Sequence, residues 1–228
     1  MKNAQTVLAV YDSFESADRA IRALVDDGFS RADIGLAAND VRGDYNRLHN
    51  PTAAASEDVS GGEGGSFGAV IGGITGAVAA LTAIVIPGIG PVIAAGPLVA
   101  LLGGATGAVV GGAAGAVTGG LAASLIHLGV PEAEATHYGE SVRRGNALVT
   151  VTVDNDEDAE TATNVMRRYN PVDVKSRASK WRESGWAGYD AEAQPYTTDE
   201  LNRERELYPA DTLPEEEVVN RYYPTPRS

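Results

Sequence analysis

The sequence predicts an α+β protein in which one small domain, made of two β-α-β halves, is interrupted by an apolar helical hairpin. The order strand, helix, strand occurs twice, in residues 5–40 and again in residues 130–178. Between these halves, residues 64–126 contain no Asp, Glu, Lys or Arg. From residue 179 onward the chain is acidic and contains Pro, which predicts a mostly disordered tail over 179–228.

The first half contains a predicted strand, helix and second strand. Residues 6–11 are rich in β-branched residues and predict the first strand. Apolar residues then recur at helical spacing after the candidate N-cap Ser13, and the helix is expected to end at Gly28. Residues 33–38 predict the second strand, so the crossover should be right-handed. The polar residues 41–63 that follow suit a solvated linker.

The apolar region, residues 64–128, predicts two helices and a turn. The runs 69–86 and 98–126 are each long enough to span a bilayer, and a Pro- and Gly-rich turn separates them. The turn residues are Pro87, Gly88, Gly90 and Pro91. Glycines fall four residues apart in both runs and predict helix-packing ridges: Gly64, Gly68, Gly72 and Gly76, then Gly103, Gly107, Gly111, Gly115 and Gly119.

The glycine spacing favours helix packing within lipid. There, small residues four apart allow the close backbone contact that drives helix association. In water, each helical glycine costs about 1 kcal/mol relative to Ala. We therefore expect membrane lipid and further copies of the chain as partners. Two observations oppose a hairpin that crosses the whole membrane: the region has no Trp or Tyr at its ends, and its loop has no charged residue. A re-entrant hairpin and a soluble oligomer that buries both helices are therefore alternatives.

The second half begins with Pro131, which suits a first helical turn, and its helix should close at Gly145. Residues 147–153 form the clearest predicted strand, followed by a helix over 154–169 and a closing strand over 172–174. Neither half has enough strands to be stable alone. Together they would make a four-stranded sheet with helices on one face, a ferredoxin-like arrangement.

Composition excludes several functions. The formal charge of −13 argues against nucleic-acid binding, and the absence of Cys rules out thiol chemistry. The N-terminus lacks the apolar core of a signal peptide. Two membrane crossings would return the chain to the side from which it started and so place all Lys and Arg on one side, which the positive-inside tendency assigns to the cytoplasm. We therefore expect the hairpin in the inner membrane with both termini in the cytoplasm; a cytoplasmic protein is the alternative.

No catalytic, cofactor-binding or metal site is predicted. The three histidines have no partner at metal-ligand spacing, and the neighbouring acids of the second half are explained by a helix start on a solvated face. No phosphate-loop motif accompanies the glycines. These histidines are His49, His127 and His137, and the acids are Glu132, Glu134 and Glu140.

Aromatic residues in the tail have two interpretations. The stretch WRESGWAGYD, with Trp181, Trp186 and Tyr189, is either a docking motif for another protein or an arm that packs its aromatics on its own domain. We favour the second interpretation, because Trp and Tyr commonly anchor by packing.

The stretches VLAVYDSFESADRAIRALVDDGFSRADIGL, IPGIGPVIAAGP and LGVPEAEATHYGESVRRGNALVTVTVD resemble the bacterial heat-induced, general stress protein family, including members called low-temperature-induced. The resemblance covers about residues 6–175. It implies a stress-linked protein without established enzymatic activity. We therefore expect a non-enzymatic stress-response protein that is membrane-associated through its glycine-zipper hairpin. A soluble oligomeric assembly, or a ligand-sensing module built on the ferredoxin-like domain, is the alternative.

Overall fold

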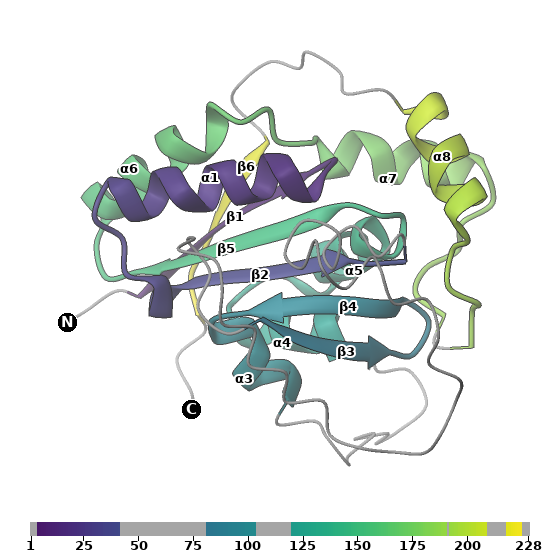
Figure 1. Ribbon diagram of the computed structural model, residues 1–228, viewed down its shortest axis with the longest axis horizontal. Helices are drawn as coiled ribbons and strands as arrows, with labels where there is room; N and C mark the ends of the chain where they lie inside the picture. The colour runs from purple at the N-terminus through teal and green to yellow at the C-terminus, as the bar shows by residue number, and fades with distance from the viewer. Residues whose placement is uncertain (1–3, 42–80, 104–119, 191, 209–217, 225–228) are drawn as a thin grey trace, which may run out of the picture.

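The computed structural model describes residues 4–41, 81–103, 120–190, 192–208 and 218–224, which form a mixed α/β structure on one six-stranded antiparallel sheet (Figure 1). The strands lie in the order β3-β4-β2-β5-β1-β6. Their bounds are Gln5–Tyr11 for β1, Ile34–Asn39 for β2, Thr82–Ile86 for β3, Gly90–Ala95 for β4, Ala147–Val153 for β5 and Val219–Tyr222 for β6.

The centre of the sheet follows the prediction. Strand β5 lies between β1 and β2 and is antiparallel to both, with Val151 opposite Val7 and Val149 opposite Leu36. Every residue of β1 is buried, because both faces of this strand are covered. A strand covered on both faces gains from apolar residues at every position, which explains its continuous apolar sequence.

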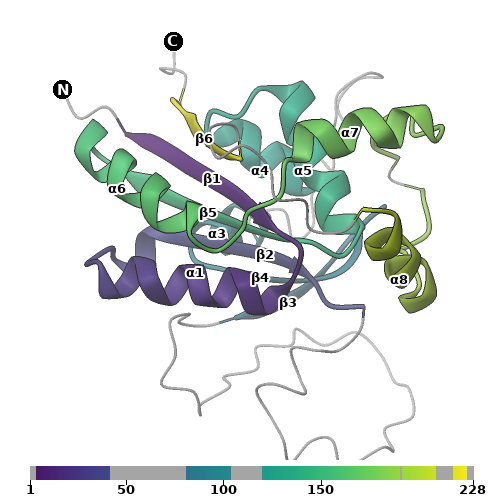
Figure 2. The ribbon, with the colours of Figure 1, turned by 90° about the horizontal axis from the view of Figure 1, so that it is seen from above.

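Helices cover both faces of the sheet, so the predicted one-faced arrangement is wrong (Figure 2). On one face, α1 (Phe14–Asp26) and α6 (Asp156–Arg167) pack against alternate β1 residues that include Val7 and Ala9. The other alternate set, Leu8 and Val10, also needs cover. Four helices supply residues to that second core: α3 (Pro97–Gly103), α4 (Gly120–His127), α5 (Glu132–Arg143) and α7 (Val174–Glu183).

The predicted closing strand over 172–174 is also wrong. Val172 donates one backbone hydrogen bond to Val10, at 2.7 Å, but pairing stops there. The side chain of Asp173 accepts from the backbone N–H of Ser176 and begins α7 instead. The outer position beside β1 belongs to β6, far along the chain, where Asn220 pairs with Leu8.

The described part of the apolar region contains a β-hairpin, where two helices were expected. Residues 82–86 form β3 and residues 90–95 form β4, which pairs with β2. The β-branched residues Ile84, Val85, Ile86, Val92 and Ile93 favour strands, which explains the difference.

The distance between residues 102 and 120 rules out the predicted single helix over 98–126. Such a helix would place residues 102 and 120 about 27 Å apart. A Cβ atom at position 120 would instead lie 3.6 Å from Leu102 Cδ2. Helices α3 and α4 are therefore separate, and the last turn of α3 lies next to the start of α4.

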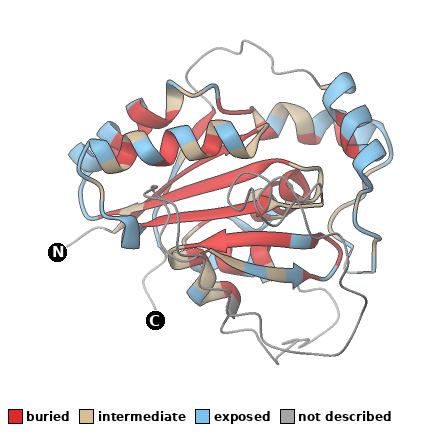
Figure 3. Ribbon diagram, viewed as in Figure 1, coloured by how far each residue is buried: buried red, intermediate tan, exposed pale blue. Residues whose placement is uncertain are grey.

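Much of the expected disordered tail is folded onto the domain (Figure 3). Besides α7 and β6, the tail contains α8 (Thr198–Leu207), which begins with a capping box between Thr197 and Glu200. Trp181 is completely buried, so the interpretation of aromatics packing on their own domain is confirmed for this residue. A short 3-10 turn, Arg31–Asp33, precedes β2 and completes the described elements.

Candidate functional site

The predicted turn residues join two strands. Pro87 and Gly88 lie between β3 and β4, and Gly90 and Pro91 begin β4. Gly88 and Gly90 have φ angles of +72° and +105°, in the region that favours glycine. The turn prediction is therefore correct in place, but the flanking elements are strands.

Most of the predicted glycine ridges lie outside the described residues. These are Gly64, Gly68, Gly72, Gly76, Gly107, Gly111, Gly115 and Gly119. Gly103 is the last residue of α3. The apolar side chains that flank this part belong to the domain core, since Leu98, Leu121 and Leu125 are fully buried under the sheet.

A C-terminal arm, residues 184–190 and 192–197, crosses the β3–β4 turn. The Tyr189 hydroxyl donates to the carbonyl oxygen of Pro87. A Cβ atom at Gly90 would lie 2.7 Å from Pro195 Cβ, so the arm packs closely against the start of β4. Arg143 donates to the carbonyl oxygen of Gln194 at 3.0 Å and holds the same segment from α5.

A buried charge cluster fastens α8 to α5 and α7. Arg144 donates to Glu140 at 2.6 Å and to Glu204 at 2.9 Å, while the indole N–H of Trp181 donates to Glu204 at 2.7 Å. The guanidinium carbon also lies 4.8 Å from the ring centre of Trp181. Burial opposes the charge of Arg144, but the two carboxylates outweigh burial and raise its pKa.

The predicted solvated face of α5 is therefore wrong in part. Glu132 is exposed as expected, whereas Glu134 is half-buried and Glu140 is 2% exposed. The helix turns Glu140 toward Arg144 and α8, which the sequence prediction did not include as a folded element.

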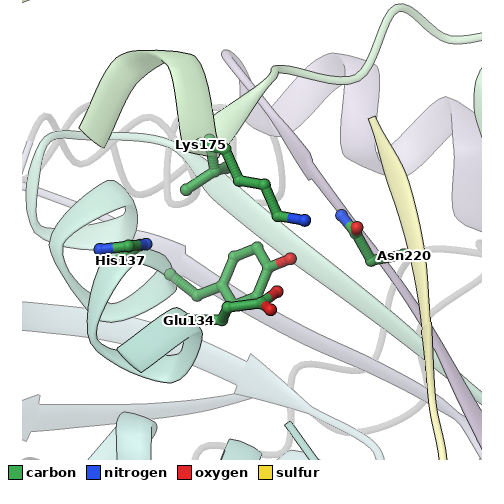
Figure 4. A pocket seen from close by; sticks show the side chains of 6 residues that line it. Glu134, His137, Lys175 and Asn220 are labelled. Carbon is green, nitrogen blue, oxygen red and sulfur yellow. The ribbon is translucent and has the colours of Figure 1, made fainter. Parts of the chain in front are cut away.

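A small pocket, with about 230 Å³ of free space including the part open to solvent, lies where α5, the start of α7 and β6 meet (Figure 4). Its walls come from segments that are far apart in sequence. The lining residues are Glu134, His137, Tyr138, Val174, Lys175 and Asn220.

A chain of hydroxyl groups runs along one side of this pocket. Tyr138 Oη and Tyr222 Oη are 2.7 Å apart, and Tyr222 donates to Glu134 Oε2 at 2.6 Å. Because Tyr222 gives its proton to the carboxylate, Tyr138 is the donor to Tyr222. Burial raises the pKa of both tyrosines, so these groups act as hydrogen-bond donors at neutral pH and are poor candidates for nucleophiles.

Lys175 supplies the positive charge of the pocket. Its ammonium group points across the pocket toward Asn220 in Figure 4 and forms no hydrogen bond or ion pair with any described residue. A cation in the first turn of a helix is unfavourable next to the helix dipole. The enclosed part of the pocket measures only about 10 Å³, room for about one water molecule, so a larger polar group would have to bind at its open mouth.

Sequence reasoning missed this pocket because its prediction assigned 172–174 to a strand and the tail to disorder. Of its lining residues, only Glu134 and His137 were weighed beforehand as candidate site residues. One signal in the sequence could have indicated part of the pocket: Asp173 is a favourable N-cap residue and predicts a helix that begins there, with Lys175 in its first turn. His127 closes α4, and His49 lies outside the described residues. Within the described ranges no three His, Cys, Asp or Glu side chains gather as metal ligands.

Comparison with protein-family models, curated proteins and solved structures finds no match to this chain. None of the helices in the described part of the chain has both the length and the apolar character needed to cross a bilayer.

Proposed function

We propose that this chain is a non-enzymatic stress-response protein that associates with the cytoplasmic face of the inner membrane through its uncharged region, with both termini in the cytoplasm. The α/β domain remains outside the lipid. The same glycine-rich residues mediate association with further copies of the chain. The resemblance of residues 6–175 to general stress proteins supports the stress role.

One observation carries the membrane proposal. The 16 residues 104–119 contain no charge, and they connect two points that are neighbours on the domain, Leu102 and Gly120. An insert of this kind can enter lipid without unfolding the domain that bears it. The uncharged residues 64–80 end just before β3, and Val85 on that strand is 79% exposed, which adds apolar surface to the same region.

We also propose that the domain core is ferredoxin-like. Strands β2, β5, β1 and β6 lie side by side in this order in the sheet. Along the chain, α1 connects β1 to β2, and α6 follows β5. This order supports a split pair of β-α-β units in which β6 replaces the expected strand over 172–174. Strands β3 and β4 then extend the sheet beyond β2.

The test is flotation of the full chain with phosphatidylcholine vesicles in high salt. Zwitterionic lipid and salt suppress charge attraction, so flotation would report apolar insertion. We expect the full chain to float. Replacement of residues 104–119 by a Gly/Ser linker of equal length removes the apolar side chains of this segment and should reduce both flotation and cross-linked oligomers. The domain should still fold, because the residues that flank the segment are already neighbours and a flexible linker can join them.

The matched control replaces the 16 residues 42–57 of the polar linker by the same Gly/Ser sequence and should float like the parent chain. Circular dichroism of both variants separates loss of folding from loss of binding. A full chain that stays with the vesicle-free fraction would overturn the proposal. Equal flotation of the parent and the 104–119 variant would also overturn the assigned role of that segment.

A second candidate function is ligand sensing, and the pocket favours it. The Lys175 ammonium and the Asn220 amide face the same space, where a small anion could bind. Titration of inorganic phosphate followed by NMR would distinguish this function, since it should shift amides of α7 and β6 in the parent chain and leave Lys175→Met unchanged.

A further inference from the structure

His137 lies at the contact between α5 and the end of α7. Its Nε2 atom is hydrogen-bonded to the guanidinium of Arg182, and its ring centre lies 5.7 Å from that of Trp186. Trp186 in turn meets Trp181 edge-on, with ring centres 6.0 Å apart. The histidine therefore sits beneath the first residues of the C-terminal arm.

The contact with Arg182 requires a neutral imidazole. A guanidinium group only donates and stays charged, so Nε2 of His137 must accept and the ring proton must reside on Nδ1. That Nδ1 atom is buried and has no hydrogen-bond partner among the described residues. A second ring proton would point a donor at a donor.

The charged groups around His137 also oppose protonation. Arg182 and Lys175 face it from α7, and Glu134 faces it from its own helix. The carboxylate of Glu134 already accepts from Tyr222 on β6, which limits its ability to neutralise an imidazolium. Burial lowers the pKa of His137, Arg182 and Lys175 lower it further, and Glu134 opposes them.

We propose that His137 is a proton-operated latch that holds Trp186 and the C-terminal arm on the domain when neutral and releases them when protonated. The path of the arm gives the latch a consequence. Beyond Trp186 the arm reaches the β3–β4 turn through the hydrogen bond from Tyr189 to Pro87. Release of Trp186 therefore loosens the arm as far as the contact of Tyr189 with the turn, whereas Arg143 still holds the arm further along, at Gln194. The latch does not depend on membrane association.

The direction of the pH effect follows from the lowered pKa. Above about pH 6.5, the ordinary histidine pKa, His137 is neutral whether the arm is docked or released, so its full contribution to docking of the arm is present. Its stabilising contribution falls as the pH drops below that value toward the lower pKa of the docked state. Acid therefore opens the latch.

The chain contains only two Trp residues, and both lie at this contact, so tryptophan emission reports on the latch directly. The experiment follows emission wavelength and acrylamide quenching from about pH 8 to about pH 5. An imidazolium can quench a nearby indole without any movement, so intensity alone is not used. We expect a red shift and greater acrylamide access with a midpoint below about 6.5.

His137→Gln keeps a neutral acceptor for Arg182 and should remove the acid transition, while His127→Gln should retain it. Hydrogen exchange of residues 184–190 provides a second measurement, with faster exchange at low pH expected only where His137 is present. Far-UV circular dichroism should stay constant and so exclude global unfolding. The latch is overturned if the parent chain shows no transition, or if His137→Gln shows the same one.

Discussion

Replacing Tyr222 with Phe tests whether β6 is an integral part of the fold. The substitution removes one hydroxyl and leaves the ring, which is 7% exposed, in place. Two hydrogen bonds are lost, one with Tyr138 at 2.7 Å and one to Glu134 at 2.6 Å. A neutral hydrogen bond contributes about 1 kcal/mol and one to a charged group about 1.5–3 kcal/mol. Because Glu134 is half-buried and water can replace part of its lost bond, we expect a loss of about 2–3 kcal/mol.

Urea unfolding monitored by circular dichroism measures this loss. The midpoint should fall while the slope stays the same, since the surface exposed on unfolding is unchanged. The matched control is Tyr223→Phe at the next position, where the side chain is 57% exposed and should matter by less than about 0.5 kcal/mol. Equal midpoints for the two variants would refute the conclusion that Tyr222 joins β6 to α5.

Two further predictions concern backbone strain and the buried charge cluster. Gly96 has a φ angle of +63°, and a Cβ atom there would lie 1.9 Å from the carbonyl oxygen of Ile34, so Gly96→Ala should lower the melting temperature markedly. Gly139→Ala, inside α5 with nothing within 4 Å, should instead stabilise by about 0.5–1 kcal/mol; the opposite order of melting temperatures would contradict this. Glu204→Ala leaves Arg144 and the Trp181 indole without their shared acceptor and should cost about 2–4 kcal/mol in urea unfolding. The exposed Glu206→Ala on the same helix should cost almost nothing, and equal losses would show that the cluster does not stabilise α8.

The parts of the fold that the sequence predicted are those with local signals. Strands β1 and β5 consist of β-branched residues bounded by polar turns, and α1 begins at an N-cap that the structure confirms, Ser13. Each of these signals lies within about ten residues of chain, and apolar periodicity is strongest at that range.

The missed parts depend on contacts between distant segments. Strand β6 is four residues long and pairs with β1 across nearly the whole chain, so no local pattern identifies it. The pocket combines residues of α5, α7 and β6, and its hydroxyl chain joins Tyr138 to a residue 84 positions away. Spacing within one segment cannot predict such a site.

The apolar region was misread for a different physical reason. Burial in a protein core and immersion in lipid both favour uncharged sequence, so the absence of charge does not distinguish them. The β-branched residues of β3 and β4 provide the distinction, because they favour a sheet, whereas the glycine rows on either side favour close helix packing. Since the hairpin forms part of the sheet and Leu98, Leu121 and Leu125 lie in the core, the region cannot act as one removable unit. The proposed role in lipid therefore concerns the glycine-rich residues 64–80 and 104–119, while the described residues between them, 81–103, belong to the sheet and its core.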